Sequence, residues 1–89
     1  MKDNDQDEIL AIQALGFLGA ETDRFERFLS LSGMTVDAVR EAIASKHFLK
    51  GVLEHILADE SLLLVFCAEN NTPPEDIQPA ARRLGGGLH

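Results

Sequence analysis

Residues 28–40, FLSLSGMTVDAVR, have the pattern of a helix end, a glycine stop and a new helix start. Gly33 fits the C-terminal end of the first helix, where a left-handed residue is common. Thr35 fits the N-cap of the second helix, because its hydroxyl can accept a backbone amide. Met34 before this cap and Val39 after it have the spacing of a hydrophobic staple. We therefore predict two helices joined by a short turn.

The helical spacing of apolar residues continues on both sides of this junction, and no stretch of strand length alternates between apolar and polar residues. Five helices are predicted with defined limits, and a short sixth helix follows them. The predicted stretches are 5–18, 22–33, 35–43, 45–57 and 60–69, with N-caps at Thr22, Thr35, Ser45 and Asp59.

The run Leu62 to Ala68 is apolar on every side of the predicted helix 60–69. A helix that is apolar all round is usually buried, so we expect this one at the centre of the fold. The helix before it carries a broad apolar face, made of Phe48, Leu49, Val52, Leu53, Ile56 and Leu57. The predicted fold class is all-α, a compact irregular bundle of five to six short helices. One domain is expected to cover residues 1–89, with 1–4 and 86–89 frayed.

The start of the last helix is predicted at Thr72-Pro73-Pro74-Glu75. Threonine at the cap, proline at the first helical position and glutamate at the third form a capping box. Pro79 lies within the same helical pattern and has no amide to donate, so a kink or break is expected there. Arg82 and Arg83 fall near the C-terminal end, where the helix dipole favours cations.

Charge limits the partners that this chain can have. Fifteen acidic residues outnumber eight basic ones, and the net charge is -7. Affinity for nucleic acids depends on Lys and Arg, as does attraction to anionic lipids. The longest apolar run is far shorter than the roughly 20 residues of a membrane span.

Cys67 is the only cysteine, which favours a reducing compartment. We expect a cytoplasmic protein that binds neither nucleic acid nor membrane.

The junction at Gly33 also has the spacing of a DNA-binding helix-turn-helix motif over residues 25–45. In that motif, Asp37 and Glu41 would face the phosphates. The cations near the second helix are few: Arg40, Lys46 and Lys50. A turn of this kind is also an ordinary connection between two helices. A helix-turn-helix regulator is therefore the second hypothesis for the function.

A small enzyme with His55 as its base is the third hypothesis. His55 and Asp59 are four residues apart, and a carboxylate at this spacing can orient an imidazole for acid–base chemistry. The simpler interpretation is that Asp59 caps the next helix. Cys67 lies in an apolar run, where a thiol is buried and unreactive.

Metal and cofactor sites are not expected. His47 and His55 are two helical turns apart, and the chain has no C-x-x-C or H-x-x-x-H pair. The acidic N-terminal cluster lacks the spacing of a calcium loop and suits the positive end of a helix: Asp3, Asp5, Asp7 and Glu8. The glycines at 85–87 follow no strand and precede no helix, so they do not form a phosphate loop. No catalytic, metal-binding or cofactor-binding residue is predicted.

Several stretches, in their order and spacing, resemble a known family. They are Ala14–Leu18, Phe28–Met34, Val52–Phe66 with its centre at Leu57–Leu63, Pro73–Glu75 and Arg83–Gly86. The chain is similar to an uncharacterised alphaproteobacterial family of proteins of about this length, which is catalogued only as a domain of unknown function. The resemblance covers Ile9 to Gly86 and implies a soluble bacterial helical domain. It implies no activity, cofactor or site residue. Gln78-Pro79 departs from a smoother last helix in similar sequences.

The first hypothesis is a non-enzymatic protein-interaction or regulatory module. Its expected partner is another protein, a second copy of the chain included. A binding module needs an exposed apolar patch or groove, and an enzyme needs a pocket that holds His55 or Cys67. A DNA-binding protein needs a continuous basic surface.

Overall fold

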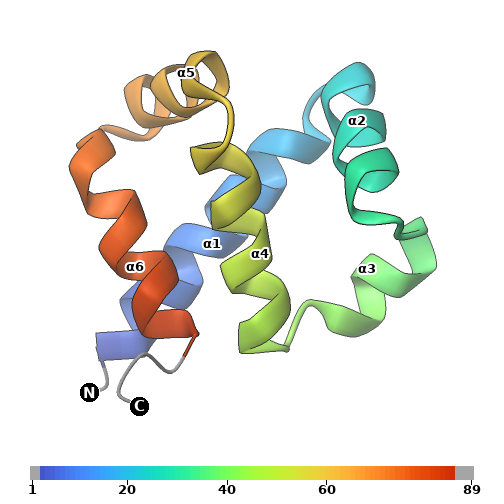
Figure 1. Ribbon diagram of the computed structural model, residues 1–89, viewed down its shortest axis with the longest axis horizontal. Helices are drawn as coiled ribbons and strands as arrows, with labels where there is room; N and C mark the ends of the chain where they lie inside the picture. Colours follow the sequence, from blue (N-terminus) through green and yellow to red (C-terminus); the bar gives the residue numbers. More distant parts are fainter. Residues whose placement is uncertain (1–2, 86–89) are drawn as a thin grey trace.

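The computed structural model describes residues 3–85, which form six α-helices and one 3-10 turn (Figure 1). The elements are α1 (Asp3–Gly19), α2 (Thr22–Ser32), α3 (Val36–Ala42), α4 (Lys46–Leu57), α5 (Glu60–Asn70), η1 (Pro74–Asp76) and α6 (Ile77–Leu84). The described residues contain no strand, and the predicted all-α bundle is confirmed. Residues 3 and 4, expected to be frayed, belong to α1. The fraying predicted for 1–2 and 86–89 lies outside the described residues.

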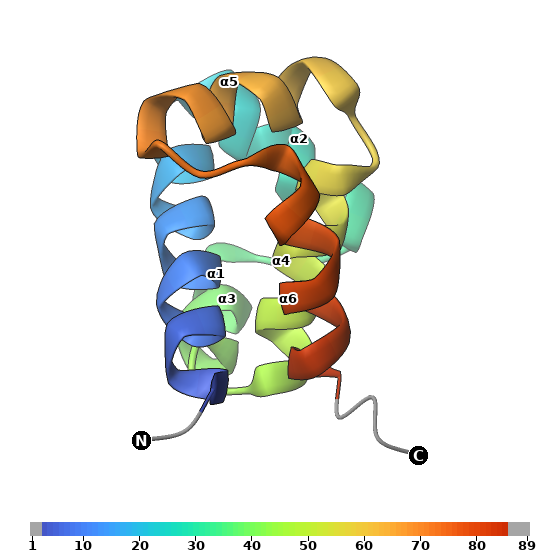
Figure 2. The same ribbon diagram turned by 90° about the vertical axis from the view of Figure 1, so that its left-hand side faces the viewer.

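The central helix of the bundle is α4, which lies between α1 and α6 (Figures 1 and 2). Its most extensive packing is with α6, followed by its packing with α1. Leu49, Val52, Leu53 and Ile56 of α4 are buried. These residues recur at helical spacing and form one apolar face, which two neighbouring helices cover.

The prediction that helix 60–69 lies at the centre is wrong. This helix, α5, lies across one end of the bundle (Figure 2). Only its Phe66 and Cys67 are buried, whereas Leu64 and Val65 are 51% and 43% exposed. Leu63 is half-buried. Because α5 is apolar all round, its sequence does not mark an inner side. The helix at the centre, α4, is the one whose apolar residues form a defined face against two neighbours.

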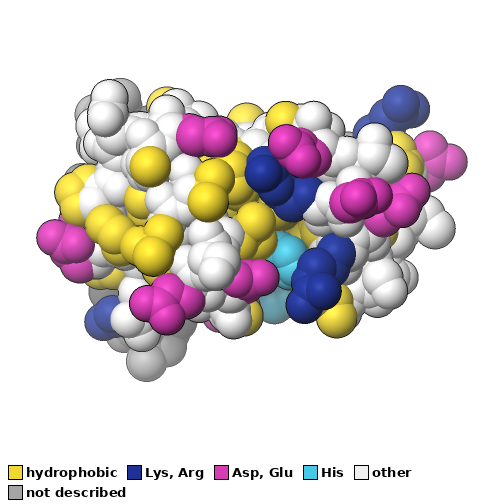
Figure 3. Space-filling model, turned by 90° about the horizontal axis from the view of Figure 1, so that it is seen from above, with side chains coloured by type: hydrophobic (Ala, Val, Ile, Leu, Met, Phe, Trp, Pro, Cys, Tyr) yellow, Lys and Arg dark blue, Asp and Glu magenta, His cyan; other side chains and the backbone are white. Residues whose placement is uncertain are grey.

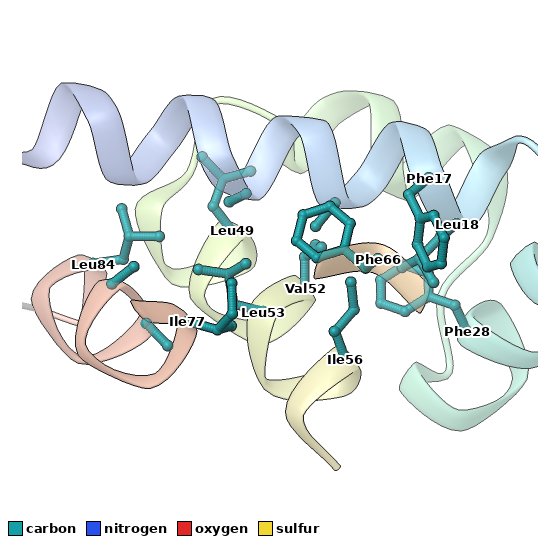
Figure 4. Close-up of a cluster of buried hydrophobic side chains, with 14 of the residues drawn as sticks. Phe17, Leu18, Phe28, Leu49, Val52, Leu53, Ile56, Phe66, Ile77 and Leu84 are labelled. Carbon is teal, nitrogen blue, oxygen red and sulfur yellow. The ribbon is translucent and has the colours of Figure 1, made fainter. Parts of the chain in front are cut away.

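Phe66 anchors α5 to the core. Its side chain is fully buried, and its ring centroid lies 5.3 Å from that of Phe17 with the planes tilted by 59°. Tilted aromatic pairs at this separation are favourable beyond their buried area. Figure 4 shows Phe17 and Phe66 near one end of the core, which also holds Leu18 and Phe28. The other end is filled by Leu49, Leu53, Ile77 and Leu84.

Three predicted N-caps are confirmed. The cap oxygens accept backbone amides as follows: Thr35 Oγ1 from Ala38 at 3.1 Å, Ser45 Oγ from Phe48 at 3.2 Å and Asp59 Oδ1 from Leu62 at 3.2 Å. Gly33 ends α2 in the left-handed conformation, at a φ of 71°. Glycine adopts this conformation without the steric cost that a Cβ brings, so the turn between α2 and α3 depends on it.

Helix α2 differs from the prediction at its start. Thr22, the predicted N-cap, lies inside α2, and Glu21 occupies the cap position without a side-chain hydrogen bond. In α3, the apolar residues Val36 and Ile43 at its two ends are 46% and 41% exposed. Val39 is the one buried residue of α3, because a helix of only two turns has little surface to bury.

The capping box predicted at residues 72–75 is absent. Thr72 Oγ1 instead donates a hydrogen bond to the carbonyl oxygen of Asn70 at 3.1 Å and closes the turn after α5. Pro74 starts the 3-10 turn η1, and α6 begins only at Ile77. Pro79 therefore lies in the first turn of α6, where no intrahelical amide is needed. The break expected at Pro79 does not occur.

An ion pair that sequence analysis did not predict joins α1 to α6. Arg83 Nε and Nη2 donate to Oδ2 and Oδ1 of Asp7 at 2.7 and 2.9 Å. Two parallel bonds of this kind are among the strongest charge-assisted hydrogen bonds. The Asp7 side chain is 5% exposed, whereas that of Arg83 is 50% exposed. The buried carboxylate therefore needs the guanidinium, which reaches it from solvent.

Phe66→Ala should lower the free energy of unfolding by about 3–5 kcal/mol, because it removes a fully buried ring. Leu64→Ala is the matched control on the same helix, and it should cost less than about 1 kcal/mol because Leu64 is half-exposed. Urea denaturation followed by circular dichroism measures both losses. Equal losses for the two variants would show that α5 does not pack through Phe66.

Arg83→Met should lower the free energy of unfolding by about 1–3 kcal/mol, because it leaves the buried carboxylate of Asp7 without its main partner. The double variant Asp7→Leu/Arg83→Met should recover part of this loss, because it also removes the buried charge. Urea unfolding of the single and double variants completes the mutant cycle. Strictly additive losses would contradict a coupled pair.

Candidate functional site

The outer side of α5 forms an exposed apolar face. Four of its exposed residues recur every three to four positions, which places them in one stripe along the helix: Ser61, Leu64, Val65 and Ala68. We call this stripe the α5 face. Figure 3 looks onto the end of the molecule that α5 and α2 occupy, and hydrophobic side chains gather over the part that α5 covers. Leu57, Leu62 and Leu63 are half-buried and pack against the core.

Acidic residues border the α5 face. Glu60 and Glu69 are exposed near the two ends of α5. Glu75 and Asp76 of η1 are exposed as well, but they lie near Cys67 on the inner side of α5, where their charges raise the pKa of its thiol. Neither α5 nor η1 contains a lysine or an arginine. An apolar surface with this border is complementary to a surface with apolar residues and flanking cations.

Arg24 of α2 has a structural role. Its Nη1 donates to the carbonyl oxygen of Phe17 at 2.9 Å, and its guanidinium carbon lies 4.0 Å from the centroid of the Phe17 ring. Glu21 pairs with the same guanidinium at 3.9 Å. Arg24 thus caps the carbonyl end of α1 and stacks on an aromatic face.

His55 lies on α4 with its ring against Phe28, with ring centroids 5.1 Å apart. Burial lowers the pKa of His55, and the charge of Arg27 lowers it further, while Asp59 acts in the opposite direction and less strongly. Asp59 accepts the amide of Leu62, so its predicted role as a cap is confirmed. Within residues 3–85, no hydrogen bond or ion pair joins His55 to Asp59. The imidazole of His55 therefore packs between α4 and α2.

Cys67 is 5% exposed and faces the core from α5. Burial raises the pKa of its thiol, and the negative charges of Glu75 and Asp76 raise it further. A thiol with a raised pKa carries little thiolate at neutral pH and is a poor nucleophile. This environment agrees with the interpretation of Cys67 as a core residue.

The residues considered as metal ligands are apart in the structure. His47 is exposed near the start of α4, two turns from His55. Asp7 is engaged by Arg83, and Glu8 pairs with Lys46 at 3.8 Å. Across residues 3–85, no three His, Cys, Asp or Glu side chains are grouped so that they could hold a metal ion. In the same part of the chain, every helix is too short or too polar to cross a membrane.

The helix–turn–helix junction is present, but its second helix has an acidic outer surface. Asp37 and Glu41 are exposed on α3, with Arg40 between them. The two helices α2 and α3 are barely packed against each other, unlike the helices of a DNA-binding motif. Two of the three cations considered for phosphate contacts are paired with carboxylates: Lys46 with Glu8 and Lys50 with Glu54, the latter at 2.6 Å.

Six helices in residues 3–85, with α4 at the centre and an exposed apolar helix at one end, define this protein as an all-α bundle. The chain belongs to the family described as "Protein of unknown function (DUF3572)", whose family model matches residues 4–87. The resemblance to a domain of unknown function is thereby confirmed. No curated protein and no solved structure matches the chain.

Protonation of His55 should make the fold less stable as the pH falls from about 7 to about 5. Burial lowers the pKa of His55 in the folded state, so the unfolded chain, with its ordinary pKa of 6.5, takes up the proton first. The contribution of neutral His55 to the free energy of unfolding is fully present above the pKa of the unfolded chain. It is lost as the pH falls through the lower pKa of the folded state. Urea unfolding at several pH values should show a flatter dependence for His55→Gln. An unchanged slope for His55→Gln would contradict the assignment.

Proposed function

We propose that this protein is a non-enzymatic interaction module that binds another protein through the α5 face. The main support is the exposure of Leu64 and Val65 on a helix whose cap and inner side are well formed. Contiguous apolar surface of this kind marks interaction sites in soluble proteins, because covering it releases water from apolar groups. The lone buried cysteine, Cys67, supports a cytoplasmic location for this interaction.

The partner that fits the α5 face is an amphipathic helix with basic residues beside its apolar stripe. The eleven residues of α5 extend for about 16 Å, enough for two or three apolar anchors of a helix laid along it. Glu60 and Glu69 would face the flanking cations of such a helix. The net charge of -7 would also attract a basic partner over a longer range and raise the rate of association.

The regulator and enzyme hypotheses have less support. An acidic α3 with Asp37 and Glu41 on its outer side would repel phosphates. If His55 acted as a base, its imidazole would be packed against Phe28 and would have no carboxylate hydrogen-bonded to it for orientation. Neither hypothesis explains why α5 leaves Leu64 and Val65 in water.

To test this proposal, a photo-cross-linking amino acid is introduced in place of Leu64, in cells that naturally make the protein. We expect one discrete adduct from position 64 and none from the same probe at Glu41 on α3. The captured protein, once purified, should bind the wild-type chain directly, with an affinity that falls as salt rises.

Matched variants decide whether the α5 face carries this binding. Leu64→Lys should weaken binding of the captured protein at least tenfold, about 1.4 kcal/mol, because it places a charge in the apolar contact. Val36→Lys is the control, since Val36 has similar exposure on another helix, and it should leave the affinity unchanged. Isothermal titration calorimetry measures both affinities. Equal adducts from positions 64 and 41, or equal effects of the two variants, would refute the proposal.

A further inference from the structure

Helices α2 and α3 are weakly fastened to the rest of the bundle. We call residues 20–45, which contain both helices and the links at their ends, the α2–α3 arm. Within residues 3–85, α2 packs substantially on α1 alone, and α3 packs substantially on no other helix. Figure 1 shows the arm on the opposite side of α4 from α6. The arm buries only Phe28 and Val39, whereas α4 and α6 bury four residues each.

The ring of Phe28 is the main contact between the arm and α4. It is 3% exposed, and its centroid lies 5.1 Å from that of His55 and 6.2 Å from that of Phe48. Both contacts are edge-to-face, a geometry that aromatic rings favour. A second fastening lies at the base of the arm, beside the link to α1, where Arg24 donates to the carbonyl oxygen of Phe17 at 2.9 Å. Beyond this base, the arm therefore depends mainly on one aromatic contact.

The layer of α1, α4 and α6 is held together without the arm. These three helices pack more extensively on one another than any of them packs on α2 or α3. Asp7 and Arg83 join α1 to α6 directly. Helices α2 and α3 have only 11 and 7 residues, and isolated helices of this length are marginal in water. Once Phe28 leaves its place, the arm should therefore unfold while the layer stays folded.

His55 makes the contact with Phe28 sensitive to pH. The charged groups that act on its imidazole come from both neighbouring segments: Arg27 of α2 and Asp59 of the link to α5. Burial and the charge of Arg27 lower the pKa of His55 while the arm is docked, and Asp59 opposes them less strongly. In the open state the imidazole loses this cover, so its pKa returns toward 6.5. The docked state is fully favoured above that pKa and loses this advantage as the pH falls through the lower pKa of docked His55.

We propose that the α2–α3 arm is a pH-sensitive strap, which is released from the layer of α1, α4 and α6 while that layer stays folded, and whose release is favoured by protonation of His55. Release uncovers the end of the core that Phe28 closes, where Phe17 and Leu18 also lie (Figure 4). It needs no partner at the α5 face and is independent of the function proposed above.

Amide hydrogen exchange of the full chain, followed by NMR near pH 7, separates the arm from the layer. The ratio of the observed to the intrinsic exchange rate gives the population of the open state for each amide. Amides of α2 and α3 should exchange through an opening about a hundredfold more populated than the one that exposes α4 and α6. A single opening shared by all these helices would overturn the proposal.

Matched variants in the arm and in the layer test whether the opening is local. Phe28→Leu should speed exchange in the arm about tenfold, because the ring contact is broken in the open state. Ile77→Val is the control, since Ile77 is buried in the layer in both states. It should speed exchange in α4 and α6 and leave the arm unchanged. Equal increases in the arm and the layer for Ile77→Val, or no increase in the arm for Phe28→Leu, would refute a separately opening strap.

The role of His55 is tested by lowering the pH from 7 to about 5. The population of the open arm, corrected for the intrinsic exchange rate, should rise several-fold in the wild type and show a flatter dependence in His55→Gln. Arg27→Gln should raise the pKa of His55, read from the NMR shifts of its ring protons, and weaken the pH dependence. Arg40→Gln removes the same charge from α3 and should change neither. Opening that does not vary with pH, or equal effects of the two arginine variants, would overturn this role.

Discussion

Burial of one face of α4 between α1 and α6 is the constraint on which the other helices depend. Val52, Leu53 and Ile56 occupy the inside of this three-helix layer, and none of the three is exposed to solvent. The ion pair of Asp7 and Arg83 ties the two covering helices together. A chain this short cannot cover both sides of every helix. The outer sides of α5 and α1 are left in water for this reason.

Local signals in the sequence were reliable where the interaction stays within one helical turn. The caps at Thr35, Ser45 and Asp59 each join a side chain to an amide three residues later, so the sequence contains both groups at the right spacing. The position of α5 has no such local cause. A helix that is apolar on all sides can place any side against the core, and the choice of Phe66 over Leu64 depends on where α1 presents Phe17.

The α5 face could not be recognised from the sequence, because the helix is uniformly apolar and only the small residues Ser61 and Ala68 beside Leu64 indicate its outer side. The pairing of Asp7 with Arg83 could not be predicted, since only the fold brings these distant residues together.

The stability of the fold depends on the presence of α6, because this helix covers the apolar face of α4. Helix α6 packs against α4 more extensively than any other helix does, through Ile77, Ala80, Ala81 and Leu84. A product that ends early or is clipped before this helix leaves the apolar face of α4 open along its length. Such a product is recognisable to chaperones and proteases by the same exposed surface that prevents it from folding.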